Sequence, residues 1–539
     1  AVYDQREYLS LDPQQLRLTE QTYKRFVRAG ALLTPAQKEQ LKKINEQLSR
    51  LGVQFGNNLL ADNNAFTLVI DKQEDLAGVP ASIQSAASTE AVNRKMEGKW
   101  VFTLSKPSMI PFLSYSERRD LREKLYKAYL ERCNRGDSTD NKQIVNETAK
   151  LRLEKARLMG YPSYGAFALD DEMAQTPENA YALLDKLWQP SLELAKKELE
   201  EMKAIKKAET GDDSFESWDW WYYAEKVRKQ KYDLNEEMLR PYLSLDNVVQ
   251  GIFQLSNRLW GITFRPVSVP VYHKECIAYE VLDKDNKHLG ILYFDFFPRP
   301  GKQGGAWCGA YREERYEEGE RIAPVVTIVA NVSRPATPNG VALLNLDETE
   351  TLFHEFGHAL HSLFSQVHYA GIGGVEQDFV ELPSQLMENW AFEPDMLRMY
   401  AKHYQTGDPM PDDLIEKIQR SALFNQGFTT TELLAASLSD MDIHTITEYR
   451  PIDLNAFEKE MLNGKRGLIP QIEPRYRYPY FAHIFGGGYA AGYYSYIWAE
   501  VLDKDAYEAF VESGDIFDRT TAESYRKNIL ERGGSEGGM

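Results

Sequence analysis

The stretch His354-Glu355-Phe356-Gly357-His358 has the form HExxH and lies in a segment whose apolar residues recur at helical spacing. The apolar stripe consists of Leu352, Phe356, Leu360 and Leu363. Asp347 is a suitable N-cap, because Glu350 follows three residues later as in a capping box. The sequence therefore predicts a helix that begins near residue 347 and carries the HExxH residues.

Two histidines four residues apart lie one turn above each other on a helix, so both imidazoles can reach a single point. Imidazole nitrogens are preferred ligands of Zn²⁺, and a glutamate beside them can act as a general base. We therefore predict His354 and His358 as zinc ligands, with Glu355 bordering the same ion. The alternative is a helix that carries these three residues without a metal.

A catalytic zinc needs a third protein ligand and an open coordination position. The segment 359–363 contains no glycine or further histidine in the register of an HExxHxxGxxH motif. A glutamate on a following helix is the other common solution, and Pro383 marks the first turn of such a helix. Glu381 and Glu388 lie two turns apart on one face, and spacing alone leaves both open, with surface or capping roles as alternatives.

Long amphipathic helices dominate the segment before residue 240. Thr34 is placed to cap a helix with Pro35 at its first position. Its apolar stripe consists of Leu41, Ile44, Leu48, Leu51 and Phe55. A second stripe, 184–202, contains Pro190, which we expect to kink or divide the helix.

The pattern changes to that of strands between residues 262 and 335. Ile277–Val281 and Leu289–Phe294 flank a turn at 283–286 and predict a hairpin, and Val325–Val329 is a further β-branched run. Helical patterns resume after residue 347. The sequence predicts a mainly α protein with a small inserted β-sheet, organised as segments 1–240, 241–346 and 347–539.

Composition excludes several classes of protein. The chain has 539 residues, which is enough for several lobes. Its net charge is −18, from 63 Lys and Arg against 81 Asp and Glu, and this negative charge argues against nucleic-acid binding. No run approaches the ~18–20 apolar residues of a membrane span. The three cysteines are widely spread, which favours a reducing compartment, so we predict a cytoplasmic protein with the periplasm as the alternative.

Three strings resemble the zinc metallopeptidases of the thimet oligopeptidase and peptidyl-dipeptidase Dcp family. They are His354–His361, Phe379-Val380-Glu381-Leu382-Pro383-Ser384-Gln385 and the tyrosine-rich run 480–496. The last looks like the Dcp version, because Gly486-Gly487-Gly488 separates Phe485 from Tyr489. The resemblance extends through Trp218–Leu234 and Gly304–Gly309 and covers essentially the whole chain.

The resemblance implies a role for each residue of these strings. Glu381 would be the third zinc ligand, with one Zn²⁺ per chain, and Glu388 a supporting carboxylate. Tyr496 would be the hydrogen-bond donor to the oxyanion. If the stretch is helical, Tyr489 and Tyr496 lie on one face of the helix. The alternative for a tyrosine-rich run is packing between helices. The further contacts with substrate or transition state would come from His483, Tyr489, Tyr493, Gly487, Gly488 and Gly373.

The resemblance also implies two helical lobes around a deep substrate channel, which restricts substrates to short unstructured peptides. Release of C-terminal dipeptides needs a group that binds a free carboxylate, for which Arg475 and Arg477 are candidates. We expect a monomeric peptidyl-dipeptidase; an oligoendopeptidase or a catalytically silent peptide-binding protein are the alternatives. Family members extend beyond the points that match Ala1 and Met539, so a truncated form is expected.

Overall fold

The computed structural model describes residues 2–337 and 339–538, most of which are helical. The helices of the N-terminal half are α1 (Pro13–Arg28), α2 (Pro35–Ala65), α3 (Ala81–Asn93), α4 (Lys106–Tyr115), α5 (Arg119–Leu130), α6 (Lys142–Leu158), α7 (Tyr164–Leu169), α8 (Pro177–Thr210), α9 (Trp220–Tyr232), α10 (Glu236–Leu239) and α11 (Leu245–Trp260). The helices of the C-terminal half are α12 (Leu346–Phe364), α13 (Leu382–Ala391), α14 (Pro394–Tyr400), α15 (Asp412–Arg420), α16 (Gln426–His444), α17 (Leu454–Lys459), α18 (Ala482–Phe485), α19 (Ser495–Glu512) and α20 (Arg519–Tyr525). The predicted mainly α fold is confirmed.

The predicted start of α2 is confirmed in atomic detail. The Thr34 side chain accepts a hydrogen bond from the Gln37 backbone N–H, and the Gln37 side chain returns one, which completes a capping box in front of Pro35. Pro190 does not divide the helix, because α8 continues from Pro177 to Thr210. A single proline removes one backbone hydrogen bond of the helix, and the buried stripe of α8 holds the rest in place.

A five-stranded sheet is inserted between α11 and α12, with strand order β3-β4-β5-β9-β6. Its strands are β3 (Thr263–Pro266), β4 (Ile277–Leu282), β5 (His288–Asp295), β6 (Trp307–Arg312) and β9 (Val325–Val329). The predicted hairpin is confirmed as antiparallel β4 and β5, whereas β5 and β9 are parallel. Two short two-stranded sheets pair β1 (Leu68–Ile70) with β2 (Trp100–Phe102) and β7 (Arg315–Glu317) with β8 (Glu320–Ile322).

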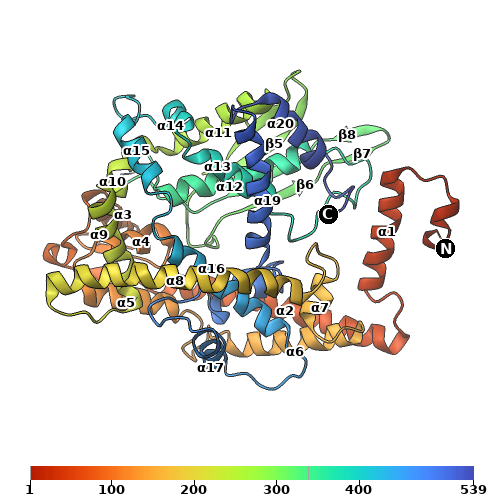
Figure 1. The fold of residues 1–539 in the computed structure, drawn as a ribbon, viewed down its shortest axis with the longest axis horizontal. Coiled ribbons are helices and arrows are strands. Elements are labelled where there is room, and N and C mark those ends of the chain that lie inside the picture. Colours follow the sequence, from red (N-terminus) through yellow and green to blue (C-terminus); the bar gives the residue numbers. More distant parts are fainter. Residues whose placement is uncertain (1, 338, 539) are drawn as a thin grey trace.

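The hydrophobic cores divide the chain into two lobes, which lie one above the other in Figure 1. The lower lobe combines α2–α9 with α16–α18, since residues 428–497 share cores with residues 44–227. The upper lobe combines α10–α15, the five-stranded sheet and α20 around one large core. Helix α19 runs between them, so the segment 347–539 contributes to both lobes.

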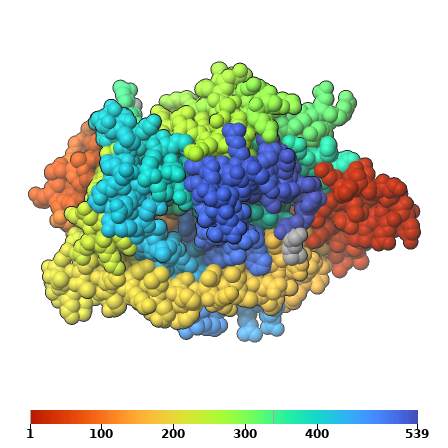
Figure 2. All heavy atoms as spheres, turned by 45° about the horizontal axis from the view of Figure 1, so that its top comes forward, coloured from red at the N-terminus to blue at the C-terminus, as the bar shows by residue number. Residues whose placement is uncertain are grey.

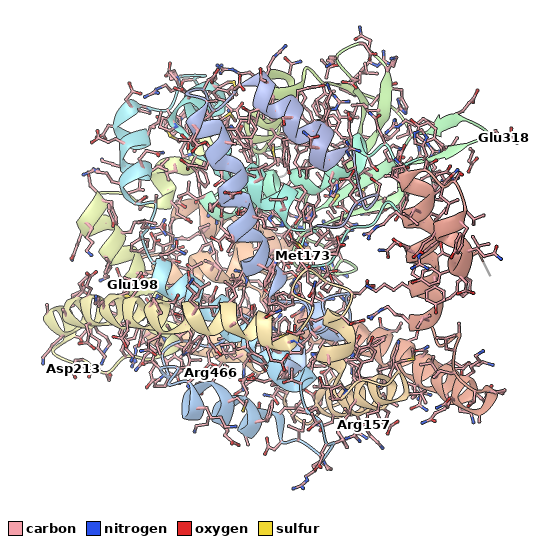
Figure 3. The ribbon with its side chains drawn as sticks, turned by 45° about the vertical axis from the view of Figure 1, so that its right-hand side comes forward. Arg157, Met173, Glu198, Asp213, Glu318 and Arg466 are labelled. Carbon is pink, nitrogen blue, oxygen red and sulfur yellow. The ribbon has the colours of Figure 1, made fainter. Side chains whose placement is uncertain are left out.

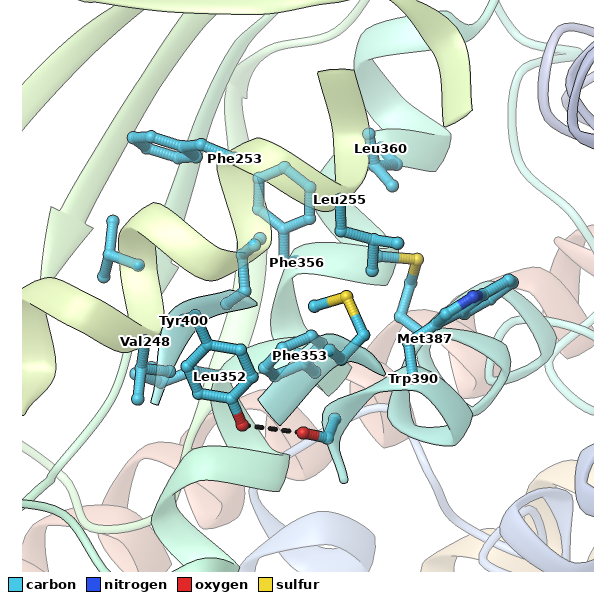
Figure 4. Packing of buried hydrophobic residues seen from close by; sticks show 14 of the residues in the cluster. Val248, Phe253, Leu255, Leu352, Phe353, Phe356, Leu360, Met387, Trp390 and Tyr400 are labelled. Carbon is cyan, nitrogen blue, oxygen red and sulfur yellow. Dashed lines mark hydrogen bonds between the residues drawn. The ribbon is translucent and has the colours of Figure 1, made fainter. Parts of the chain in front are cut away.

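Helix α12 is buried in the upper lobe on the face opposite its polar residues. Phe353, Phe356 and Leu360 pack against α11 and against Met387 and Trp390 of α13 (Figure 4). The Tyr400 hydroxyl donates a 2.6 Å hydrogen bond to the Ala391 carbonyl at the end of α13. This packing leaves only the polar face of α12 turned towards the lower lobe.

In the space-filling view α8 (yellow) runs as a continuous rim below the C-terminal helices in blue (Figure 2). No described helix combines the length and the apolarity needed to cross a membrane.

Candidate active site

A cavity of about 3120 Å³ lies between the lobes. Its wall includes side chains of α2, α4 and α16 from the lower lobe, and of β6, α12 and α13 from the upper lobe. The predicted substrate channel therefore has a counterpart in the described residues, and the HExxH face of α12 forms part of its lining.

Helix α12 begins two residues earlier than predicted. The N-cap is Asn345, whose side chain accepts a 2.7 Å hydrogen bond from the Glu348 N–H, while the Glu348 carboxylate accepts one from the Asn345 N–H. Asp347 is thus inside the helix rather than its N-cap. The prediction failed because Asn345–Glu348 and Asp347–Glu350 both fit a capping box, and Glu348 also accepts hydrogen bonds from Ser333.

The three predicted metal ligands meet at one point. His354 and His358 project from successive turns of α12, and their Nε2 atoms lie 3.2 and 3.1 Å from Oε2 of Glu381, at the start of α13. One ligand atom from each residue lies within 4.8 Å of the others. Two imidazole nitrogens and a carboxylate oxygen are the donor set of a catalytic zinc site.

Neighbouring groups orient each of these ligands. His354 Nδ1–H donates a 2.6 Å hydrogen bond to Glu388 Oε1, which leaves the Nε2 lone pair directed at the common point. Glu381 is buried, and its carboxylate accepts hydrogen bonds from the Ser384 hydroxyl at 2.8 Å and the Tyr489 hydroxyl at 2.6 Å. The donor set and its supporting hydrogen bonds fit a zinc ion, and Glu388 has a supporting position rather than a ligand position.

A close helix crossing brings Glu381 to the two histidines. Gly357 lies against the first turn of α13, where an added Cβ would be 2.2 Å from the Pro383 carbonyl oxygen and 2.5 Å from Ser384 Cα. Only glycine allows this approach of the two backbones. The glycine of the motif therefore sets the separation between α12 and α13.

Glu355 occupies the cavity side of the same helical turn. Its side chain is buried, and its Oε2 atom has no hydrogen-bond partner among the described residues. Burial raises the pKa of the Glu355 carboxyl, although the neighbouring His354 and His358 oppose the shift. A buried carboxylate with a free oxygen next to a metal-binding group can accept a proton.

The tyrosine-rich run forms one aromatic cluster beside the metal-binding group. The Tyr489 and Tyr496 rings stack with centroids 5.5 Å apart, Tyr493 lies 5.1 Å from Tyr496, and His483 lies 5.2 Å from Tyr493. Burial raises the pKa of Tyr496 well above its usual value. Burial lowers the pKa of His483 to about 4, and the positive charge of Arg475 adds to the shift. Both side chains are therefore neutral hydrogen-bonding groups near pH 7.

The expected helical face shared by Tyr489 and Tyr496 is not found. Tyr496 lies in the first turn of α19, whereas Tyr489 precedes a turn in which Ala491 has a left-handed φ of 56°. Buried Asp440 of α16 holds this turn, since its carboxylate accepts 2.9 Å hydrogen bonds from the Ala491 and Tyr493 N–H groups. The two rings meet because the chain folds back, and not because of helical spacing.

Asp440 and Asp378 are functional supports that the sequence reasoning missed. Asp378 is buried three residues before Glu381 and accepts hydrogen bonds from the Met173 and Ala174 N–H groups at 2.9 Å and from the Tyr494 hydroxyl at 2.7 Å. Met173 belongs to the lower lobe and lies between α8 and the upper lobe in Figure 3. No local motif marks either aspartate, because their partners are distant in sequence.

The remaining predicted residues are divided between the cavity and the outside. Gly487, Gly488 and Gly373 line the cavity, as does Arg475. Arg477 does not appear in the cavity wall, and it forms an ion pair with Glu458 at 2.8 Å.

Comparisons with known proteins agree with this arrangement. The profile of Peptidase family M3 matches residues 112–539. The chain is 40% identical to dipeptidyl carboxypeptidase of Escherichia coli (strain K12) and 37% identical to oligopeptidase A of the same organism, covering 99% and 98% of this chain and 79% of each relative. A solved structure of PZ peptidase A with an inhibitor has the same fold, with a TM-score of 0.55 over 97% of this chain and 74% of that chain at 15% identity.

Proposed function

The chain belongs to Peptidase family M3, and on this premise we propose that it is a zinc-dependent peptidase that cleaves short, unstructured peptides within its cavity. The observation that carries the proposal is the unpartnered, buried carboxylate oxygen of Glu355 beside the His354, His358 and Glu381 group. A protein that only bound peptides would have no use for a buried general base at this position.

His354, His358 and Glu381 would hold the zinc, which when bound supplies Lewis-acid polarisation of the scissile carbonyl and makes water more acidic. Glu355 takes a proton from the attacking water and transfers it to the leaving amine. Tyr496, held neutral by burial, donates a hydrogen bond to the developing oxyanion.

The neighbouring residues position substrate and catalytic groups. The hydrogen bond from Tyr489 to Glu381 fixes that ring beside Tyr496, and neutral His483 offers a ring nitrogen, Nδ1, that has no partner among the described residues. Tyr493 and the glycines at 373, 487 and 488 line the path of the peptide. Enclosure between the lobes favours flexible peptides, because a folded domain would not enter the cavity.

Release of C-terminal dipeptides is the activity that we favour, and the 40% identical dipeptidyl carboxypeptidase supports it. Internal cleavage is the second candidate, which the 37% identical oligopeptidase A supports. The two activities differ in one requirement, because only the first needs a group that recognises a free C-terminal carboxylate.

Mass spectrometry of peptide cleavage tests the proposal. The substrates are a blocked peptide with a free C-terminal carboxylate and the same peptide as its C-terminal amide, each with and without a chelator and with Glu355→Gln. Loss of a dipeptide from the free acid, abolished by the chelator and by the variant, is expected. Equal internal cleavage of both peptides would establish the second candidate, and no cleavage of either would refute a peptidase function.

A further inference from the structure

Two cationic side chains face the cavity without an anionic partner. Lys106 is the first residue of α4 and is exposed at the cavity. Arg475 also lines the cavity, and its backbone N–H donates a 3.0 Å hydrogen bond to the Glu432 carbonyl of α16. Within the described residues neither side chain forms an ion pair within 4.0 Å. Arg132 and Arg312 of the cavity wall also lack an ion pair, but they donate hydrogen bonds to Asn63 Oδ1 and to the Ala323 carbonyl. Arg334 is paired with Glu275 at 2.7 Å.

Lys106 and Arg475 belong to one cluster around Tyr476. Burial opposes ionisation of the Tyr476 phenol, but Lys106 and Arg475 outweigh it and lower its pKa. The acidic groups that face the cluster are Glu432 and Asp347. Burial raises the pKa of Glu432, although both cations oppose the shift. Since neither cation has a carboxylate within 4.0 Å among the described residues, both can donate hydrogen bonds to an anion in the cavity.

A row of aromatic rings connects this cluster to the metal-binding group. The Tyr489 hydroxyl donates a hydrogen bond to Glu381. The ring centroids of Tyr489 and Tyr496 lie 5.5 Å apart, and those of Tyr496 and Tyr493 lie 5.1 Å apart. Tyr493 in turn interacts electrostatically with Arg475. A peptide whose scissile carbonyl lies between Glu355 and Tyr496 can therefore extend along these rings towards the cluster.

We propose that Lys106 and Arg475 bind the C-terminal carboxylate of the substrate and thereby fix the cleavage point two residues from the end. This inference rests on the proposed peptidase function. Arg475 supplies a planar guanidinium that can bind a carboxylate through two hydrogen bonds, and Lys106 adds a mobile charge from the opposite element. Arg477, the other arginine of the segment, has no such role because Glu458 already binds it.

The test compares hydrolysis of N-acetyl-tetra-alanine with hydrolysis of its C-terminal amide by the full chain loaded with zinc. The variants are Lys106→Gln, Arg475→Gln and Arg475→Lys, and Arg334→Gln is the control for loss of a cavity charge that is already paired. Calorimetric titration with dialanine and with dialaninamide measures carboxylate recognition without turnover. Zinc content and thermal unfolding report whether each variant retains its fold and metal.

Each glutamine variant should lower kcat/KM for the free acid by ~10- to 100-fold, as loss of a charge-assisted hydrogen bond predicts, and leave the amide unchanged. Arg475→Lys should recover part of the loss, and Arg334→Gln should behave as wild type. Equal loss for acid and amide, or full retention of acid preference, overturns the inference while the peptidase function stands. If the wild-type protein hydrolyses neither peptide, the proposed function is refuted. If, in addition, it binds dialanine no more strongly than dialaninamide, the inference is overturned as well.

Discussion

Substitution of Gly357 by alanine tests whether the contact between α12 and α13 sets the metal site. The added methyl group would lie 2.2 Å from the Pro383 carbonyl oxygen, 2.5 Å from Ser384 Cα and 2.7 Å from the Pro383 carbonyl carbon. All three are backbone atoms, so no side-chain rotation relieves the overlap. The first turn of α13 must therefore move by roughly 1 Å to restore van der Waals contact.

This movement acts directly on the metal-binding group, because Glu381 immediately precedes α13. Overpacking of a buried contact costs ~1–3 kcal/mol of unfolding free energy. Misplacement of a catalytic group by about 1 Å costs ~100-fold in rate. We expect Gly357→Ala to bind zinc at least ~10-fold more weakly and to lose ~100-fold in kcat/KM, with a modest loss of thermal stability.

Zinc affinity is measured by competition with a chromophoric chelator, the fold by circular dichroism, and activity with the blocked peptide. Gly301→Ala is the control, because an added Cβ there meets no atom within 4 Å. Wild-type zinc affinity and kcat/KM in Gly357→Ala would show that the contact does not set the separation of the ligands.

Three further predictions concern neighbouring residues. Glu388→Gln should weaken zinc binding by ~10- to 100-fold, since the hydrogen bond that orients His354 loses its charge; unchanged affinity would exclude an orienting role. Tyr496→Phe should lower kcat by ~10²–10³-fold with little change in KM, and an effect on KM alone would exclude oxyanion stabilisation. Burial raises the pKa of Glu172 to about 8, and the negative charge of Asp378 adds to the shift. The folded state therefore retains a proton that the unfolded state loses above pH 4.5. The stability of the folded state falls as the pH rises from 4.5 to about 8. Thermal unfolding at pH 5.5 and 8.5 should show Glu172→Gln gaining ~1–3 kcal/mol relative to wild type at the higher pH, whereas a pH-independent difference would contradict the shift.

Local patterns predict the elements of the metal-binding group well. The apolar stripe of α12, the spacing of His354 and His358, and the proline that opens α13 are all encoded within a few residues and correspond to short-range geometry. The start of α12 was misplaced because two overlapping pairs satisfy the same capping pattern. Contacts with Ser333, outside the helix, favour the earlier pair, and a local pattern contains no information about them.

The tyrosine segment was harder to predict for a different reason. A seven-residue spacing suggests one helical face, but the chain between Tyr489 and Tyr496 is a turn with a left-handed alanine. Asp440, which lies 51 residues from Ala491 in sequence, satisfies the backbone N–H groups of this turn. A conformation that alanine disfavours is thus maintained by a buried carboxylate from another helix, and helical periodicity in the sequence contains no trace of it.

The proposed carboxylate site shows the same limit of sequence reasoning. Arg475 and Arg477 are equivalent candidates by sequence, but the bend at residues 475–476 turns one towards the cavity and the other towards Glu458. Lys106 lies hundreds of residues away and reaches the cluster only through the packing of the lower lobe. On this arrangement the cations belong to the lower lobe and the metal ligands to the upper lobe. Under the proposed assignment the separation of the two lobes sets which bond is cleaved. A substitution that changed this separation is then expected to change the length of the released product without altering either group.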